Sequence, residues 1–191
     1  MAANRIYAQK GIHDAFVSAF AERVRALKLG DGFDPQVDIG PLIDKAAVAK
    51  VDEHFHDART GAELLAGGSS QDTRLSPPTL LAGVRRDALL TREETFGPLA
   101  AVIPFDGIDD GLAMANDTPF GLAAYLCSSN PATIARASRG IESGMVGINT
   151  GLISTAVAPF GGVKQSGLGR EGSRYGVEEY VNLKYLCHAG L

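Results

Sequence analysis

The sequence predicts an α/β fold built on a parallel β-sheet, and two observations support this class. From residue 99 onward, apolar strand candidates alternate with amphipathic helix candidates in the order strand, helix, strand, helix, strand, with short connections. This alternation is typical of βαβ units, in which successive strands run parallel and the crossovers are right-handed. The length of 191 residues and the apolar share of 45% suit one domain with a sizeable core.

The chain is predicted to begin with a strand and a helix. Residues 4–9 form the strand candidate, and Gly11 introduces a helix with an apolar stripe at helical spacing. That stripe consists of Phe16, Phe20, Val24 and Leu27. Residues 30–41 hold three glycines and two prolines, so we expect a turn-rich connection there.

A second helix is expected to begin after Asp44, whose side chain suits the N-cap position. Its core-facing residues follow at helical spacing and are Val48, Val51, Phe55 and Ala58. His54 and His56 lie two residues apart on this helix, so their side chains diverge and cannot share a metal ion. We therefore predict that both histidines lie on the solvent-exposed face.

The remaining elements follow in order. Residues 63–66 are a short strand candidate, and residues 77–84 are expected to be extended because prolines there forbid a helix. The later elements are a strand at 99–105, a helix at 108–116, a strand at 122–128, a helix from Pro131 to about Glu142 with Asn130 as its cap, and a strand at 145–149.

The last segment has the period of a half-buried strand. Its alternating positions are Val181, Leu183, Tyr185 and Cys187 on one face and Asn182, Lys184 and Leu186 on the other. A strand at the end of a chain favours pairing with the sheet of another chain.

Composition excludes several classes of function. The formal net charge of −4 argues against a nucleic-acid-binding surface, and no run of apolar residues is long enough to predict a membrane span. The N-terminus lacks the apolar core of a signal peptide, and the two cysteines have no metal-type spacing, which fits a reducing compartment, the cytoplasm. Cys127 is predicted to be a small buried residue, and Cys187 with His188 does not form a catalytic pair because adjacent side chains of an extended segment diverge.

The stretch 158–173 is the strongest candidate for a functional loop. It carries five glycines in sixteen residues and one aromatic residue, Phe160. Glycine at this density suits a backbone that turns sharply or passes close to another body, although an ordinary surface loop is the alternative. Residues 167–172 also spell G-x-G-x-x-G, but no apolar strand precedes them and no acidic residue follows at the required distance, so a dinucleotide-binding motif is rejected.

A second dense patch, Glu-Glu-Thr-Phe-Gly-Pro at residues 93–98, stands immediately before the strand at 99–105. Adjacent carboxylates in an extended segment point to opposite faces, so Glu93 and Glu94 do not form an acid–base pair, although one of them can face a cleft. A carboxylate accepts hydrogen bonds from both hydroxyls of a vicinal diol such as a ribose, and Phe96 would project from the same face against a flat ring. A charged turn with a core phenylalanine is the alternative. No segment supplies a complete catalytic set.

Four motifs resemble the C-terminal half of the aldehyde dehydrogenase superfamily. They are residues 93–98, Asn-Asp-Thr-Pro-Phe-Gly-Leu-Ala at 116–123, Gly-Ile-Asn at 147–149 and Pro-Phe-Gly-Gly-Val-Lys-Gln-Ser-Gly at 159–167. Their order agrees with the family, and the resemblance runs through essentially the whole chain. Residues 150–154, 164–173 and 180–191 resemble the succinate-semialdehyde dehydrogenases within it.

The resemblance implies an NAD- or NADP-dependent oxidation of an aldehyde to an acid through a thiohemiacetal and a thioester on a cysteine. In the family this cysteine lies just before the segment that matches residues 3–5, and the general-base glutamate, the oxyanion asparagine and the nucleotide-binding domain lie further upstream. Neither Cys127 nor Cys187 matches the nucleophile. We therefore expect this chain to contain no catalytic residue, to be inactive alone and to hold the cofactor weakly.

Four binding residues carry over by motif. Glu94 matches the acid that holds the nicotinamide ribose, and Phe96 matches the aromatic residue beside the nicotinamide. Ser154 matches a serine that helps to bind the substrate carboxylate, and Phe160 matches an aromatic residue of the substrate tunnel. The basic residues expected to anchor the loop or to form surface ion pairs are Lys164, Arg170 and Arg174.

The resemblance also implies an organisation and a set of partners. We expect a catalytic, substrate-binding domain over residues 1–178 and an oligomerisation tail strand over residues 179–191, in a homo-oligomer without a metal. Succinate semialdehyde is the expected substrate. The alternatives are another semialdehyde, such as glutarate semialdehyde, and a non-enzymatic binding or assembly module on the same fold. NAD and NADP both stay open, because the missing nucleotide-binding domain reads the 2′-position.

Overall fold

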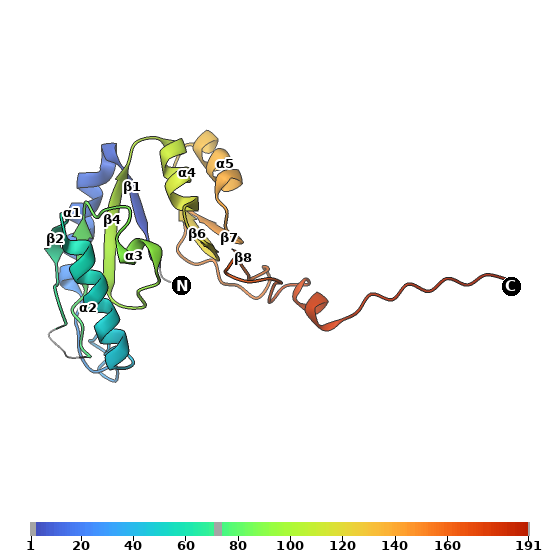
Figure 1. The fold of residues 1–191 in the computed structure, drawn as a ribbon, viewed down its shortest axis with the longest axis horizontal. Helices are drawn as coiled ribbons and strands as arrows, with labels where there is room; N and C mark the ends of the chain where they lie inside the picture. The colour runs from blue at the N-terminus through green and yellow to red at the C-terminus, as the bar shows by residue number, and fades with distance from the viewer. Residues whose placement is uncertain (1–2, 71–73, 191) are drawn as a thin grey trace. The chain divides into compact units, whose positions relative to one another are not determined.

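The computed structural model describes residues 3–70 and 74–190 (Figure 1). The chain divides into two compact units, Met1–Gly111 (unit 1) and Leu112–Leu191 (unit 2), and each is described by itself. Within the described ranges, no helix has both the length and the apolar character that a membrane span requires.

A four-stranded sheet forms the centre of unit 1 (Figure 1). Its strands, in spatial order, are β1 (Ile6–Gln9), β4 (Leu99–Phe105), β3 (Thr79–Ala82) and β2 (Glu63–Ala66). β1 and β3 both run parallel to β4, with Ile6 opposite Val102 and Thr79 opposite Leu99, whereas β2 runs antiparallel to β3. The predicted α/β class is confirmed, and β2 makes the sheet mixed.

The core of unit 1 lies where helix α1 (Lys10–Ala26) packs against this sheet. Val17, Ala21 and Val24 of α1 belong to one buried cluster with Leu80 of β3 and Val102 of β4. Leu80 and Val102 are both 0% exposed, so both strands are covered on the faces that carry them. Such continuous apolar burial is typical of strands in parallel sheets.

The buried face of α1 agrees in part with the predicted apolar stripe, since Val24 is buried and Phe20 packs against the core cluster. Small and medium side chains lie against the sheet, whereas Phe16 and Leu27 are each 39% exposed. The ring of Phe16 instead contacts that of Phe20, at 5.8 Å between centroids. A helix that approaches a sheet closely leaves little room for large rings, so these rings lie at the edge of the buried face.

Helix α2 (Lys45–Arg59) begins where the sequence predicted. Asp44 Oδ1 accepts a hydrogen bond from the Ala47 amide at 2.8 Å, as an N-cap residue does. The four predicted core residues are buried, and His56 is exposed. The predicted exposure of His54 is wrong, because this side chain is only 1% exposed. Residues 51, 54, 55 and 58 share one face of a helix, so His54 lies within the core-facing stripe.

Unit 2 consists of short strands and one longer helix. Its elements are β5 (Phe120–Gly121), β6 (Ala123–Leu126), α5 (Pro131–Gly140), β7 (Met145–Ile148), β8 (Val163–Lys164) and the 3-10 helix η1 (Gly176–Tyr180), and α4 (Ile108–Asn116) contains the boundary between the units. β6 and β7 pair in parallel across α5, which confirms the second predicted βαβ unit. The first predicted unit, from 99–105 to 122–128, is wrong, because β4 and β6 belong to different sheets. β5 pairs antiparallel with β8. Asn130 caps α5 as predicted, with its Oδ1 accepting from the amides of Ala132 and Thr133.

The predicted burial of Cys127 is wrong, whereas the predicted tail strand depends on a second chain and stays a prediction. Cys127 is exposed, because β6 ends at Leu126 and the cysteine lies beyond the strand. Residues 181–190 are assigned to neither helix nor strand, and all of them are exposed. A strand requires a hydrogen-bonding partner, and none is paired with this segment in the described part of the chain.

Asp52 of α2 carries a pH-dependent contribution to stability. Burial by itself raises its pKa, but hydrogen bonds from the Ser70 hydroxyl, the Ser70 amide and the Ser69 hydroxyl, together with the nearby His56, outweigh burial and lower the pKa below its usual value. A depressed carboxyl pKa stabilises the fold above the unfolded-state value, about 3.9, and this contribution disappears as the pH falls through the folded-state pKa.

We expect Asp52→Asn to flatten the acid limb of the stability profile. The free energy of unfolding of the wild type should fall more steeply below about pH 4 than that of Asp52→Asn, because residue 52 gains a proton on unfolding in the wild type only. Urea unfolding at a series of pH values measures the difference. Parallel profiles for the two proteins would contradict this assignment.

Candidate cofactor and substrate site

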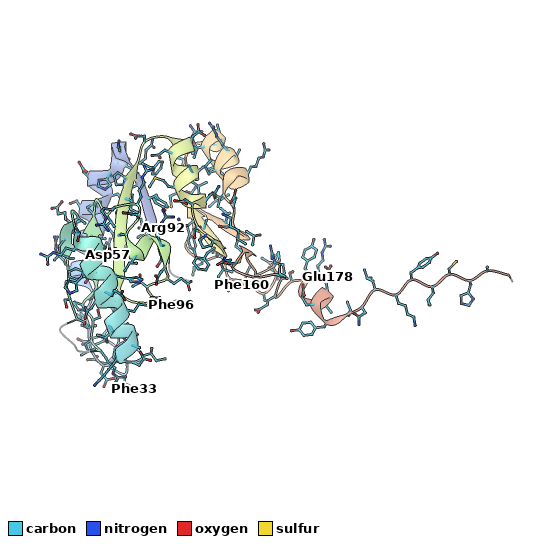
Figure 2. The ribbon with its side chains drawn as sticks, in the orientation of Figure 1. Phe33, Asp57, Arg92, Phe96, Phe160 and Glu178 are labelled. Atoms are coloured by element: carbon cyan, nitrogen blue, oxygen red, sulfur yellow. The ribbon has the colours of Figure 1, made fainter. Side chains whose placement is uncertain are left out.

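The segment of residues 93–97 connects helix α3 (Leu89–Arg92) to β4 and carries the predicted acidic and aromatic pair. Glu94 is exposed, and Phe96, labelled in Figure 2, is 83% exposed. Thr95, which lies between them, is only 4% exposed. Both candidate binding side chains are therefore accessible to a ligand. The core position that the alternative gives to Phe96 is wrong.

The backbone of this segment changes conformation at Phe96. Glu93 is extended, with φ −119° and ψ 155°, whereas Phe96 has φ 48° in the left-handed region. The left-handed conformation is rare for bulky residues and costs of the order of 1–3 kcal/mol. It persists only where the surrounding structure holds the backbone, and it is concentrated at functional sites.

Asn4 holds the 93–97 segment from the start of the chain. Its Nδ2 donates to the carbonyl of Leu90 at 2.9 Å and to that of Glu93 at 2.8 Å. Its Oδ1 accepts from the amide of Thr95 at 3.3 Å. One amide side chain thus fixes three backbone groups on both sides of the end of α3.

The buried His54 of α2 contacts the same segment with both ring nitrogens. Its Nδ1 lies 3.0 Å from the Thr95 hydroxyl, and its Nε2 lies 3.6 Å from Oε2 of Glu93. The carboxylate favours a proton on Nε2, which leaves Nδ1 to accept the hydroxyl proton of Thr95. Lys50, one turn earlier, also places its Nζ 3.6 Å from the Glu93 carboxylate.

Further contacts extend this stripe of α2 in both directions. Asp57 accepts from the Leu89 amide at 2.7 Å and so holds the start of α3. Val51 lies against Gly97 so closely that a Cβ added at the glycine would stand 2.3 Å from Cγ2 of Val51. Only glycine lets α2 approach the segment at this point.

The glycine-rich loop of unit 2 folds back on itself. Phe160 and Glu171 exchange two backbone hydrogen bonds, at 2.9 and 2.7 Å, and form an isolated antiparallel bridge. A hollow of about 710 Å³ lies beside this bridge, and its lining includes Phe160, Arg170, Val177 and Tyr180. Phe160, labelled in Figure 2, is partly exposed there, so its ring is available to a ligand.

Basic residues anchor this loop, as predicted. Lys164 donates to the carbonyl of Asn116 at 3.0 Å and pairs with Glu142. Arg170 donates from Nη1 to the carbonyl of Gly162 at 2.8 Å. Arg174 stacks its guanidinium over the ring of Tyr175 at 4.9 Å. The contacts of Lys164 and Arg170 agree with the predicted anchoring role, whereas the stacking of Arg174 involves only the adjacent residue.

Gly144, outside the loop, leaves room for the loop backbone at Gly161. A Cβ added at Gly144 would lie 2.0 Å from the carbonyl oxygen of Gly161, a distance that no side chain tolerates. Ser154 lies in the preceding connection, outside the residues that line the hollow, and is exposed. Its hydroxyl is therefore accessible, whereas Phe160 belongs to the wall of the hollow.

Among the described residues, no group of three or more His, Cys, Asp or Glu side chains is placed to hold a metal ion. Unit 1 offers an acceptor carboxylate and one aromatic ring, and unit 2 by itself offers a hydroxyl and another aromatic ring. These groups suit the recognition of a ribose diol, a flat ring and an anionic or polar substrate.

Sequence reasoning did not identify Asn4, His54 or Thr95 as part of the site. The spacing of His54 from Val51 and Phe55 was a usable signal, because it places the histidine on the buried face. No local signal identifies Asn4, since its partners lie 86 to 91 residues away in the chain.

The fold and the site define an α/β protein that presents a carboxylate and an aromatic ring from a rigid segment beside a parallel strand. The model of the aldehyde dehydrogenase family matches residues 1–186 of the chain. The chain belongs to this family.

Known relatives agree with this assignment. The chain is 50% identical to a probable NADP(+)-dependent succinate-semialdehyde dehydrogenase of Sinorhizobium fredii, with 100% of the chain and 40% of the relative aligned. It is 51% identical to a glutarate-semialdehyde dehydrogenase of Pseudomonas putida, with 97% and 39% aligned. The chain therefore spans about two fifths of the length of these relatives.

Solved structures show the same fold. The succinate-semialdehyde dehydrogenase of Burkholderia pseudomallei superposes with a TM-score of 0.94 at 49% identity, covering 98% of this chain and 40% of that one. A betaine aldehyde dehydrogenase of Staphylococcus aureus in complex with NAD+ superposes with a TM-score of 0.85 at 34% identity, covering 93% and 37%.

The contact between Gly97 and Val51 predicts a non-additive pair of substitutions. Gly97→Ala should destabilise the fold by about 1–3 kcal/mol, because the new methyl overlaps Cγ2 of a stiff side chain. Adding Val51→Ala should cost less in the Gly97→Ala background than alone, since it makes room for the methyl. Urea unfolding of the wild type, both single variants and the double variant measures the coupling. Simple additivity would contradict the proposed overlap.

Proposed function

We propose that this chain is the substrate-binding part of an NAD(P)-dependent aldehyde dehydrogenase that oxidises succinate semialdehyde to succinate. The observation that carries the proposal is the pair of exposed side chains, Glu94 and Phe96, on a strained segment that buried contacts hold in place. We interpret this pair as a nucleotide-binding site because the chain belongs to the aldehyde dehydrogenase family. The names of two relatives, a succinate- and a glutarate-semialdehyde dehydrogenase, supply the substrate class.

The residues present fit a nicotinamide nucleotide. Among the described residues, no hydrogen bond or ion pair occupies the Glu94 carboxylate, so both of its oxygens remain available to the two hydroxyls of a ribose. Phe96 presents its ring two residues away, where it can lie beside a flat heteroaromatic ring. When bound, the nucleotide would accept the hydride that leaves the aldehyde carbon.

The chain's own residues bind and orient the reactants. Glu94 fixes the ribose, and Phe96 limits the movement of the ring beside it. Ser154 donates its hydroxyl proton to the distal carboxylate of the substrate, and Phe160 excludes water from the substrate channel. The covalent thioester forms on a cysteine outside these 191 residues, since neither Cys127 nor Cys187 matches the nucleophile of the family.

Several further properties belong to this proposal. Residues 1–178 form the catalytic, substrate-binding domain, and residues 179–191 form a tail strand that pairs with the sheet of a neighbouring subunit in a homo-oligomer. The chain alone is inactive, and the whole protein works in the cytoplasm, where free cysteines such as Cys127 and Cys187 persist.

Glutarate semialdehyde is the second candidate substrate, favoured by the name of the Pseudomonas putida relative. It differs from succinate semialdehyde by one methylene, which a pocket distinguishes by only about 1–3 kcal/mol. The third candidate is a free-standing binding module that does not oxidise aldehydes.

The substrate assignment predicts the effect of Ser154→Ala in the extended protein, meaning this chain joined to the upstream sequence that brings it to the length of its relatives. Loss of a hydrogen bond to a charged group costs about 1.5–3 kcal/mol, so KM for succinate semialdehyde should rise roughly 10- to 100-fold with a small change in kcat. NAD(P)H formation measures both constants.

Thr155→Val is the matched control for Ser154→Ala, because it removes a neighbouring exposed hydroxyl, and it should leave KM unchanged. A higher kcat/KM for glutarate semialdehyde than for succinate semialdehyde would make glutarate semialdehyde the assigned substrate and leave the family unchanged. Absence of aldehyde oxidation in the extended protein would leave the binding-module reading. NAD(P)-dependent oxidation by the 191-residue chain alone would contradict its proposed inactivity.

The nucleotide assignment predicts the effect of Glu94→Gln. The amide keeps the shape of the side chain but loses the charge and one acceptor, so the dissociation constant of NAD or NADP should rise about tenfold in the extended protein. Isothermal titration calorimetry measures it. Glu53→Gln, at an exposed position of α2, is the control. Equal affinities for all three proteins would overturn the role of Glu94.

A further inference from the structure

Thr95 lies between the two residues proposed to bind the nucleotide and points the other way. It is 4% exposed, its hydroxyl meets Nδ1 of His54 at 3.0 Å, and its amide donates to Asn4 at 3.3 Å. The residue that follows, Phe96, has the strained φ of 48°. A strained backbone needs neighbouring contacts that hold it; Thr95 supplies them on one side of Phe96, and Gly97 with Val51 supplies them on the other.

We propose that the buried hydrogen bond between His54 and Thr95 positions Glu94 and Phe96 for the nucleotide. Neither His54 nor Thr95 needs to touch the nucleotide; both act through the backbone of the segment. This inference rests on the proposed function. Its consequence is that removing one buried hydroxyl weakens binding of the nucleotide while the exposed binding side chains stay unchanged.

His54 is well suited to this role because burial and two contacts restrict the movement of its ring. It is 1% exposed and is fixed on α2, and its second ring nitrogen faces the Glu93 carboxylate at 3.6 Å. The ring therefore contacts Glu93 and Thr95, the residues on both sides of Glu94. A ring held in this way transmits the position of α2 to the segment.

The chain contains a matched control for the Thr95 hydroxyl. Thr91 is also 4% exposed, and it lies four residues earlier. Its single hydroxyl proton is shared between the carbonyls of Arg86 and Ala88, at 2.8 and 2.7 Å, which lie just before it in the chain. Loss of this hydroxyl should affect stability, but it should not affect the orientation of Glu94 and Phe96.

The test uses the extended protein, with NAD and NADP as the probes in isothermal titration calorimetry. Thr95→Val keeps the volume and loses the hydroxyl, and we expect the nucleotide dissociation constant to rise about tenfold, because small misplacements of binding groups are costly. The KM for the nucleotide should rise likewise, with kcat at saturation within about twofold of the wild type. Thr95→Ser keeps the hydroxyl and should restore both constants, and Thr91→Val should lower only the Tm.

A second pair of measurements covers the case in which Thr95→Val folds poorly. His54→Leu should reproduce the weakened binding, and the double variant should bind no more weakly than either single variant, because all three lack the same contact. Without nucleotide, amide hydrogen exchange of residues 93–97 should be faster in Thr95→Val and in His54→Leu than in Thr91→Val.

The outcomes separate this inference from the proposed function. If Glu94→Gln weakens binding and neither Thr95→Val nor His54→Leu does, the positioning role is wrong and the nucleotide site stands. If Thr91→Val weakens binding as much as Thr95→Val, the effect is general loss of structure and the positioning role is again wrong. If the wild-type extended protein binds neither nucleotide, both the site and the inference fall.

Discussion

The hydrogen bonding of β4 on both of its edges is the constraint on which unit 1 depends. β1 and β3 both pair with it in parallel, and its central residues are buried, so neither its register nor its height in the sheet can change without exposing the core. The 93–97 segment leads directly into this strand. The Leu99 amide donates to the Gly97 carbonyl, and the Thr79 amide of β3 donates to that of Pro98, so the end of the segment is fixed by the sheet itself.

Side chains fix the other end of the 93–97 segment. Because the sheet holds one end and side chains hold the other, the site can be exposed and still rigid. Glu94 and Phe96 must face solvent to meet a ligand, so they cannot anchor themselves by burial. The anchoring falls to the residue between them and to three partners from distant parts of the chain, Asn4, His54 and Val51, which contact the backbone or its inward side chain. A binding site whose neighbours hold it in advance loses less entropy when the ligand arrives.

In unit 2, glycine allows the backbone of the loop to pass close to other parts of the chain. Its loop must turn back on itself beside β8 and pass over Gly144 at a distance that excludes any side chain. Arg170 then donates to the loop carbonyl of Gly162, and Lys164 ties the loop to the carbonyl of Asn116, so side-chain hydrogen bonds hold the shape of the loop. The hollow beside Phe160 follows from that shape. Matches to solved aldehyde dehydrogenases across nearly the whole chain agree with a loop whose backbone path is strongly constrained.

The sequence by itself determined the α/β class, the order of the longer helices and strands, and the caps at Asp44 and Asn130, and it singled out Glu94 and Phe96 as candidates. These features depend on local periodicity, on capping chemistry and on motifs, all of which a single stretch of chain contains. Tertiary structure alone decided the burial of His54, the exposure of Cys127, the rotation of the buried face of α1, the left-handed backbone of Phe96 and the role of Asn4. Each of these depends on contacts between residues far apart in the chain, or on how closely a helix approaches a sheet. The local pattern of residues predicts neither the long-range contacts nor the distance between helix and sheet, because the packing of the whole unit sets both.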